Sequence, residues 1–442
     1  MKRSTNININ EADVVFRQLY GSDPDVIARQ KIRYADAIEA FYRIFPSYDT
    51  RNASDHSDPS GEEDPVLSVY SAPGRTEICG NHTDHQHGRV LAAAIDLDAI
   101  AVVAANGIRK IRVQSEGYPP IEVDLSDYAP RKNETGRTGG LIRGVAAQFA
   151  SRGIDVPGFD AYVTSDVLSG SGLSSSAAFE VLMGTIIDHL GNGGQLGPVE
   201  IAKFGQIAEN QYFGKASGLM DQMVSAVGGL VEIDFADPEN PNIDSHQCDL
   251  EAQGLTLIVT DTKGSHSNLS GEYSAIPEEM RSVASFFGKK YLRDVEEEAF
   301  YEALPRLRRD PAVGDRAILR SAHFWEDDRR VHQEAEALRS GDLQRFLDLI
   351  NASGRSSECL LQNLYCTRTP QIQEIPLALM LSRRVLRNEG ACRVHGGGFA
   401  GTIQAFVPKT MVDEYTQTLE AVFGRGACHI LKIRPSGGVK VF

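Results

Sequence analysis

The sequence lacks several features that would place it in other classes of protein. It has no apolar run near the ~20 residues of a membrane-spanning helix, and its first ten residues are polar. Its six cysteines are scattered and form no CxxC pair, which argues against a zinc site. We therefore expect free thiols, no membrane association and a cytoplasmic location.

An excess of basic residues is also missing. The formal net charge is −15, with 60 acidic and 45 basic side chains. Such a balance argues against a general binder of nucleic acid or anionic membranes. It does not exclude a phosphorylated small molecule, because backbone N–H groups alone can bind phosphate.

The composition that is present predicts a large globular protein. With 442 residues and 41% hydrophobic side chains, the chain is long enough for two domains. We expect helices over residues 1 to 45, an exposed loop over 49–64 and a strand-rich region from Val66. The best candidate for a domain boundary is the turn-rich stretch 237–252.

Hydrophobic spacing places the remaining elements. A half-buried strand is expected at 159–164, one helix from Ser174 to a stop at Gly191, and another over 201–212 that stops at Gly214. Residues 277–390 look mainly helical. Further strand signals lie at 66–70, 90–95, 100–104, 111–113, 229–235, 255–260, 402–407 and 429–433.

A glycine-rich loop, 168–178, connects the alternating strand to the first of these helices. Gly170 and Gly172 let a backbone approach a ligand closely, and Ser174 to Ser176 open a helix whose free N–H groups favour an anion. The loop is either a phosphate site or a simple turn with a serine N-cap. It is not a P-loop, because the chain contains no GxxxxGK[ST].

A second glycine-rich run, 395–401, matches GxGxxG from Gly396. A strand pattern rather than a helix follows it, at 402–407. The context of a Rossmann dinucleotide site is therefore missing.

Two polar segments could carry chemistry. Ser71 to Arg75 ends a strand in a turn, and a loop with His82 and Asp84 follows, which indicates either a polar site or a solvated loop with a local ion pair. Asp221 lies among apolar residues and should need a partner. Glu209, judged from spacing alone, looks like an exposed helical glutamate.

Three segments together resemble the signature motifs of the GHMP small-molecule kinases, and specifically the galactokinases. They are Ala72-Pro-Gly-Arg-Thr-Glu-Ile-Cys-Gly-Asn-His-Thr-Asp84, Gly170-Ser-Gly-Leu-Ser-Ser-Ser-Ala-Ala178 and Gly396-Gly-Gly-Phe-Ala-Gly-Thr402. Their order and spacing fit. The resemblance runs from about Tyr70 to the C-terminus.

The resemblance implies roles for the matching positions. Asp221 falls at the catalytic aspartate, and Arg75 at the arginine that stabilises the transition state. Ser176 and Glu209 fall at the ligands of Mg2+. The ATP phosphate loop comprises Gly170, Ser171, Gly172, Leu173, Ser174, Ser175 and Ser176, and the sugar contacts are Asn81, His82, Thr83, Asp84 and Tyr273.

The resemblance also implies a fold and a reaction. The fold is α+β with two domains and the active site in the cleft between them. The expected segments are an N-terminal helical extension (1–48), an N-terminal kinase domain (64–245) and a C-terminal kinase domain (250–442). The expected reaction transfers the γ-phosphate of ATP to the anomeric hydroxyl of galactose, giving galactose 1-phosphate and ADP.

Some positions depart from the family pattern. Galactokinases usually carry Glu at position 81 and Tyr-Asn at 85–86, where this chain has Asn81 and His85-Gln86. The family glutamate is expected to hold the sugar C6 hydroxyl, so Asn81 removes a negative charge there. Plant-type galacturonate kinases share the Asp-His-Gln turn, and the basic residues that usually follow the tyrosine are missing after Tyr273.

These departures keep other functions open. A 1-kinase for galacturonate or N-acetylgalactosamine is the nearest alternative. A non-catalytic sensor of sugar and ATP is the more distant one. Intact Arg75, Asp221, Glu209 and Ser176 argue against the sensor, which has no need of a catalytic base.

Overall fold

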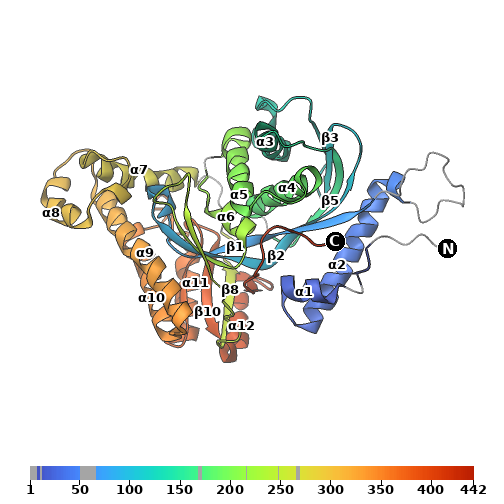
Figure 1. The fold of residues 1–442 in the computed structure, drawn as a ribbon. Coiled ribbons are helices and arrows are strands. Elements are labelled where there is room, and N and C mark those ends of the chain that lie inside the picture. The colour runs from blue at the N-terminus through green and yellow to red at the C-terminus, as the bar shows by residue number, and fades with distance from the viewer. Residues whose placement is uncertain are drawn as a thin grey trace, which may run out of the picture.

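Two β-sheets and twelve α-helices make up the described chain of the computed structural model, which covers residues 7–9, 12–49, 66–167, 172–215, 217–246, 248–264 and 269–442 (Figure 1). This is the expected α+β architecture. Short 3-10 turns lie at Pro46–Tyr48, Asp84–Gln86, Lys132–Glu134, Leu292–Asp294 and Lys409–Met411, and π-helical turns at Ala208–Phe213 and Ser357–Leu361.

The first sheet has eight strands and runs in the order β12-β1-β2-β5-β3-β4, with β6 paired to β2 and β7 to β6. All its pairs are antiparallel except β3 with β5. The strands are β1 (Ser68–Cys79), β2 (Arg89–Ala105), β3 (Lys110–Ser115), β4 (Ile121–Asp124), β5 (Phe159–Ser165), β6 (Leu230–Asp234), β7 (Asn242–His246) and β12 (Val439–Lys440).

Helices cover both faces of this sheet (Figure 1). One face packs against α3 (Thr138–Ser151), α4 (Ser175–Asn192), α5 (Pro198–Ile207) and α6 (Met220–Val227). The other face packs against α1 (Asp13–Tyr20) and α2 (Pro24–Ile44). The prediction of a half-buried strand at 159–164 is therefore wrong, because the N-terminal helices bury the second face of β5.

The second sheet has four strands in the order β11-β8-β10-β9, all antiparallel. They are β8 (Leu255–Asp261), β9 (Ala391–Val394), β10 (Thr402–Pro408) and β11 (Cys428–Leu431). Helices α11 (Glu374–Leu386) and α12 (Val412–Phe423) pack on this sheet. The other C-terminal helices are α7 (Ser270–Phe286), α8 (Glu297–Leu307), α9 (Asp315–Ser340) and α10 (Leu343–Ser356).

The first strand differs most from the prediction. Residues 71–75 do not form a turn, because β1 continues through Pro73 and Gly74 to Cys79. Register shifts against β2 occur between Pro73 and Arg75 and between Glu77 and Cys79. A bulge accommodates a proline that has no N–H to donate to the ladder. The turn predicted there is found instead at Gly80–Gln86.

Two smaller predictions are also corrected. The apolar runs at 90–95 and 100–104 belong to one strand, β2. Helix α4 passes Gly191 and ends at Asn192, with Gly193 in the left-handed conformation as its cap. The stop at Gly214 is confirmed, although the last turn before it is π-helical.

The N-terminal helices are joined to the sheet by a buried ionic cluster around Asp98 of β2. Its carboxylate accepts hydrogen bonds from Tyr20 (2.6 Å), Arg33 Nη1 (2.6 Å) and Arg434 Nη1 (2.8 Å). Burial alone would raise the pKa of Asp98, but the two guanidinium groups more than offset this and hold it below its usual value. The cluster thus ties together three distant parts of the chain.

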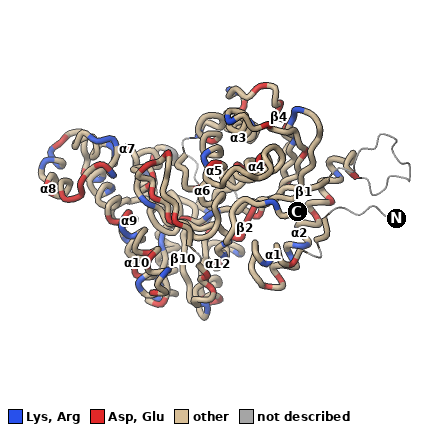
Figure 2. The backbone as a smooth tube through the Cα atoms, in the orientation of Figure 1, with Lys and Arg blue, Asp and Glu red and all other residues tan. Residues whose placement is uncertain are grey.

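The surface and the thiols agree with the composition. Figure 2 shows basic and acidic residues interspersed along the chain, without a basic stripe. The six cysteines are free, and Cys79, Cys366 and Cys392 are buried. Among the described helices, none is long and apolar enough to cross a membrane.

Candidate active site

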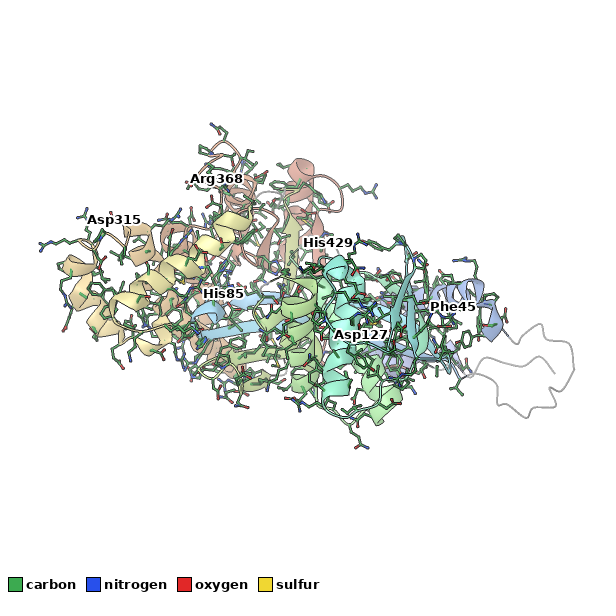
Figure 3. All side chains as sticks on the ribbon, turned by 90° about the horizontal axis from the view of Figure 1, so that it is seen from above. Phe45, His85, Asp127, Asp315, Arg368 and His429 are labelled. Atoms are coloured by element: carbon green, nitrogen blue, oxygen red, sulfur yellow. The ribbon has the colours of Figure 1, made fainter. Side chains whose placement is uncertain are left out.

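A cavity of 260 Å³ lies where the end of β1, the following turn and the start of α6 meet the glycine-rich loop between β9 and β10. His85, which is labelled in Figure 3, is one of the residues that line it. The lining residues are Arg75, Glu77, Asn81, His82, Asp84, His85, Lys215, Ser217, Gly218, Met220, Asp221, Gly396 and Gly397. Because both sheets contribute, the cavity lies in the expected cleft.

Arg75 and Asp221 form a two-pronged ion pair in this cavity. Arg75 Nε donates to Asp221 Oδ1 and Nη2 donates to Oδ2, both over 2.7 Å. Ser174 Oγ donates to the same Oδ2 over 2.6 Å. Burial would raise the pKa of Asp221, but Arg75 and then Ser174 more than offset it, so the pKa lies below its usual value.

Local structure explains how these three residues meet. Asp221 lies in the first turn of α6, where unpaired N–H groups favour a carboxylate. Arg75 follows the first bulge of β1, and its Nη1 also donates to Gly172 O. Ser174 precedes α4 with a positive φ of 59°, a conformation that a serine adopts only under constraint.

Glu209 is buried rather than exposed, because the π-helical turn after α5 directs it inward. Its Oε1 accepts hydrogen bonds from Lys215 Nζ (2.7 Å) and Ser176 Oγ (3.2 Å), and its Oε2 accepts from Gln222 Nε2 (3.0 Å). Neighbouring oxygen ligands of octahedral Mg2+ lie about 3.0 Å apart. The separation of the Ser176 and Glu209 oxygens fits that requirement.

Asp84 and His82 reach the cavity from the turn after β1. Asp84 Oδ1 accepts from the backbone N–H of His85 (2.9 Å), and a Cβ placed on Gly218 would lie 2.3 Å from Oδ2. His82 has a φ of 62° and its Nε2 lies 3.1 Å from Gly397 O. Burial lowers the pKa of His82 to about 3, so its ring is neutral.

Thr83 and Tyr273 lie behind the cavity lining. The hydroxyl of Thr83 donates to the backbone oxygens of Gly80 (2.8 Å) and Arg89, which fixes the turn. The hydroxyl of Tyr273, on α7, donates to Gly398 O over 2.8 Å and so supports the glycine-rich loop. Thr83 and Tyr273 remain predicted sugar contacts. In this structure they support the turn and the glycine-rich loop that line the cavity.

Glu77 is a lining residue that the sequence reasoning missed. It lies two positions after Arg75 on the same strand, and alternate residues of a strand share a face. Glu77 Oε1 accepts from Asn81 Nδ2 over 2.7 Å. The i, i+2 spacing would have revealed Glu77 if residues 71–75 had been read as a strand.

Helix α9 holds the backbone of the turn that follows β1 through hydrogen bonds. Asp327 Oδ2 accepts from the backbone N–H groups of Gly80 (3.3 Å) and Asn81 (3.2 Å). His323 Nε2 lies 3.0 Å from Asn81 O. These fully buried contacts fix the backbone that carries the predicted sugar contacts.

A larger cavity of 920 Å³ includes Ser175 and Ser176, at the start of α4, among its lining residues. Its walls are mostly apolar and include Leu141, Val163 and Phe179. Its size suits a nucleotide. Of the predicted phosphate loop, Gly170 and Ser171 lie outside the described residues, and Leu173 is fully buried.

The second glycine-rich run connects two antiparallel strands, β9 and β10. Gly396, Gly398 and Gly401 all have positive φ. A strand–loop–strand hairpin has no helix N-terminus to hold a pyrophosphate, so the rejection of a Rossmann site is confirmed. Through Gly396 and Gly397, the run instead forms part of the wall of the 260 Å³ cavity.

One further cluster in the described chain has the spacing of metal ligands. Atoms of Glu232, Asp244 and His246 lie within 4.8 Å of one another. Arg339 lies 3.6 Å from the Asp244 carboxylate and 4.0 Å from that of Glu232. Because this cation already compensates both carboxylates, we assign no metal there.

Comparison with known proteins agrees with this geometry. The model of the GHMP kinases N terminal domain matches residues 140–229, and that of the galactokinase galactose-binding signature matches residues 55–105. The fold resembles Lactococcus lactis galactokinase complexed with galactose, with a TM-score of 0.73, 21% identity, and coverage of 91% of this chain and 99% of that one.

Two more distant structures share the fold. Mevalonate kinase of Methanococcus jannaschii has a TM-score of 0.59 at 15% identity, over 85% of this chain and 99% of its own. Phosphomevalonate kinase of Streptococcus pneumoniae, in complex with phosphomevalonate and AMPPNP, has a TM-score of 0.55 at 14% identity, over 84% and 99%.

The two family matches and the two-domain fold define a small-molecule kinase. Residues 140–229 carry the N-terminal domain of the GHMP kinases, a family that uses ATP as co-substrate. Residues 55–105 carry the galactokinase galactose-binding signature, and the chain is a sugar kinase.

Proposed function

We propose that the protein is a galactose 1-kinase, which converts galactose and ATP to galactose 1-phosphate and ADP. The observation that carries the proposal is the Arg75–Asp221 pair, at 2.7 Å in both prongs, in a small polar cavity beside a nucleotide-sized one. Phosphoryl transfer depends on positioning and charge stabilisation, and this arrangement supplies both.

Asp221 acts on the sugar hydroxyl in this proposal. Its lowered pKa keeps it ionised at neutral pH, so it accepts the hydroxyl proton or orients the hydroxyl for attack. Arg75 holds the carboxylate in place and provides positive charge near the transferred group. Ser174 fixes Oδ2 and links the aspartate to the phosphate loop.

Ser176 and Glu209 would hold Mg2+, which neutralises charge on the ATP phosphates when it is bound. Lys215, which now donates to Glu209 Oε1, would yield that oxygen to the ion. The backbone N–H groups at the start of α4 would receive phosphate oxygens, with the nucleoside in the 920 Å³ cavity.

The sugar would occupy the 260 Å³ cavity. Asp84 is suited to accept hydrogen bonds from two neighbouring hydroxyls, since its Oδ2 accepts none from the described residues. We further propose that the domains divide at 64–245 and 250–442, with 1–48 as an extension. Strand β7 of the first sheet ends at His246, and β8 of the second sheet begins at Leu255. Of the described strands, only β12 returns from the C-terminal segment to the first sheet, where it pairs with β1.

The alternatives remain as competing outcomes of one experiment. A kinase for galacturonate or N-acetylgalactosamine would use the same Asp221 and Arg75. A non-catalytic sensor would not need the two-pronged pair or the hydrogen bond from Ser174.

The test is ADP release from purified protein with Mg-ATP against galactose, galacturonate, N-acetylgalactosamine, glucose and arabinose. The proposal predicts turnover that is fastest with galactose and is lost in Asp221→Asn. Asp237→Asn, at an exposed turn, is the matched control. Preference for another sugar would replace the substrate. ATP binding without turnover of any sugar would support the sensor.

A further inference from the structure

The 260 Å³ cavity, in which the sugar is proposed to bind and which we call the sugar-side cavity, is rich in carboxylates. Among the described residues that line it, no lysine or arginine lacks a carboxylate partner. Glu77, Asp84 and Asp221 all line it. Its lysine and arginine are already engaged, because Arg75 pairs with both oxygens of Asp221 and Lys215 pairs with Glu209. A ligand carboxylate would therefore meet negative charge without a lysine or arginine free to compensate it.

Glu77 is the member of this set that the proposed mechanism does not use. It is only 5% exposed, and its Oε1 accepts from Asn81 (2.7 Å) and lies 3.5 Å from Arg393 Nη2. Its Oε2 receives no hydrogen bond from the described residues. Oε2 is not one of the buried unpaired oxygens of the described chain, so it faces the cavity, where a ligand hydroxyl can replace water as its donor.

The position of Asn81 in the motif predicts a contact with the ligand, but its side-chain hydrogen-bonding groups are already used within the protein. Both of its amide hydrogens are donated, one to Glu77 Oε1 and the other to Gly396 O over 2.6 Å. Its Oδ1 accepts from Asn363 Nδ2, also over 2.6 Å. The side chain can offer a ligand no donor. It instead holds the Glu77 carboxylate in a fixed orientation.

We propose that Glu77 selects the sugar at this site. Its Oε2 accepts a hydrogen bond from a hydroxyl of a neutral galactose-type sugar, and its charge rejects a sugar acid such as galacturonate. The loss of charge at position 81 is thus compensated by Glu77, four residues earlier. Burial raises the pKa of Glu77 although Arg393 and Arg75 oppose it, which fits a carboxylate that lacks a donor in the free protein. This inference rests on the proposed sugar kinase function.

The experiment compares kcat/KM for galactose and galacturonate in the wild-type protein, Glu77→Gln and Glu77→Asp. We expect the wild-type protein to prefer galactose by about 100-fold or more. Glu77→Gln should lower kcat/KM for galactose about tenfold. It should also reduce the preference for galactose over galacturonate by about tenfold or more, because the negative charge of the carboxylate is lost. Glu77→Asp should lower kcat/KM for galactose but still reject galacturonate, because it keeps the charge and withdraws the oxygen. Glu298→Gln, exposed on α8, is the matched control.

The outcomes separate this inference from the proposed function. If the wild-type protein uses galactose but Glu77→Gln keeps the full preference, Glu77 does not select the sugar and only this inference fails. A wild-type preference for galacturonate also overturns it. If neither sugar is turned over and calorimetry detects no binding of galactose, the proposed function fails as well. If Glu77→Gln does not fold, Glu77→Asp provides the test. An unchanged kcat/KM for galactose in Glu77→Asp would show that Glu77 does not select the sugar.

Discussion

Arg75 and Asp221 lie 146 positions apart in the sequence and are joined by two parallel hydrogen bonds of 2.7 Å each. The arginine comes from a bulged strand and the aspartate from the first turn of a helix. Their contact connects the first sheet, the glycine-rich loop before α4 and the 260 Å³ cavity at one point.

This pair makes a prediction about pH. Asp221 has a folded-state pKa below its unfolded value, so it should stay ionised well into the acid range. We expect no loss of kcat/KM from this group until below about pH 5, given an ordinary aspartate pKa of about 3.9. In Arg75→Ala, the largest effect that opposes burial is lost and the smaller effects of Ser174 and Lys215 remain, so the pKa of Asp221 should rise and the acid limb should move to higher pH. A pH–rate profile of both proteins measures the shift, and an unmoved limb would contradict the pairing.

The same shift affects stability. A depressed folded-state pKa stabilises the fold above the unfolded pKa of about 3.9, and that contribution disappears as the pH falls through the folded pKa. The variant Asp221→Asn lacks this titration. The difference in the free energy of unfolding between the wild-type protein and Asp221→Asn should therefore become smaller as the pH falls from 5 to 3. Urea unfolding at several pH values tests this, and a constant difference would show that the pair adds no pH-dependent stability.

Gly218 is expected to be intolerant of a side chain. A Cβ at this position would lie 2.3 Å from Asp84 Oδ2, so Gly218→Ala must push the carboxylate aside. We expect KM for the sugar to rise about tenfold, with KM for ATP nearly unchanged. Gly314→Ala is the control, because a Cβ there meets nothing within 4 Å. Equal changes in both KM values would argue against a local effect on the sugar site.

The cluster around Asp98 predicts how the N-terminal helices are held. Asp98→Asn would remove the carboxylate charge that Arg33 shares with the fully buried Arg434, and it would leave Arg33 with Asp166 as a charged partner. We expect the free energy of unfolding to fall by about 3 kcal/mol, in line with the loss of one partner of a buried ion pair. Urea denaturation measures it against Asp124→Asn, at an exposed position. A change no larger than that of the control would show that the helices are held by apolar packing alone.

The elements that depend on local sequence pattern could be predicted from the sequence. The motif positions around Arg75, Asp84 and Asp221 do meet at one cavity, and the helices of 174–212 form with small shifts at their ends. These features follow from short-range spacing and capping, which a single sequence records directly.

Features that depend on pairing between distant parts of the chain could not be predicted from the sequence. Pro73 and Gly74 look like a turn, but pairing with β2 keeps them in the strand, and this hid Glu77. Asp96 and Asp98 split the pattern of β2 into two runs, yet both are satisfied by distant partners. Asp96 accepts from the backbone N–H of Lys432 over 2.9 Å. A polar residue in a buried strand is explained only once its partner is known.

The most direct test is the identity of the product. After incubation of the wild-type protein with Mg-ATP and galactose, two-dimensional proton–phosphorus NMR shows which sugar carbon carries the phosphate. We expect a phosphate on the anomeric carbon, together with one ADP per sugar, and no product from Asp221→Asn. A phosphate on another carbon, or ADP formed without a sugar phosphate, would contradict the proposed 1-kinase activity.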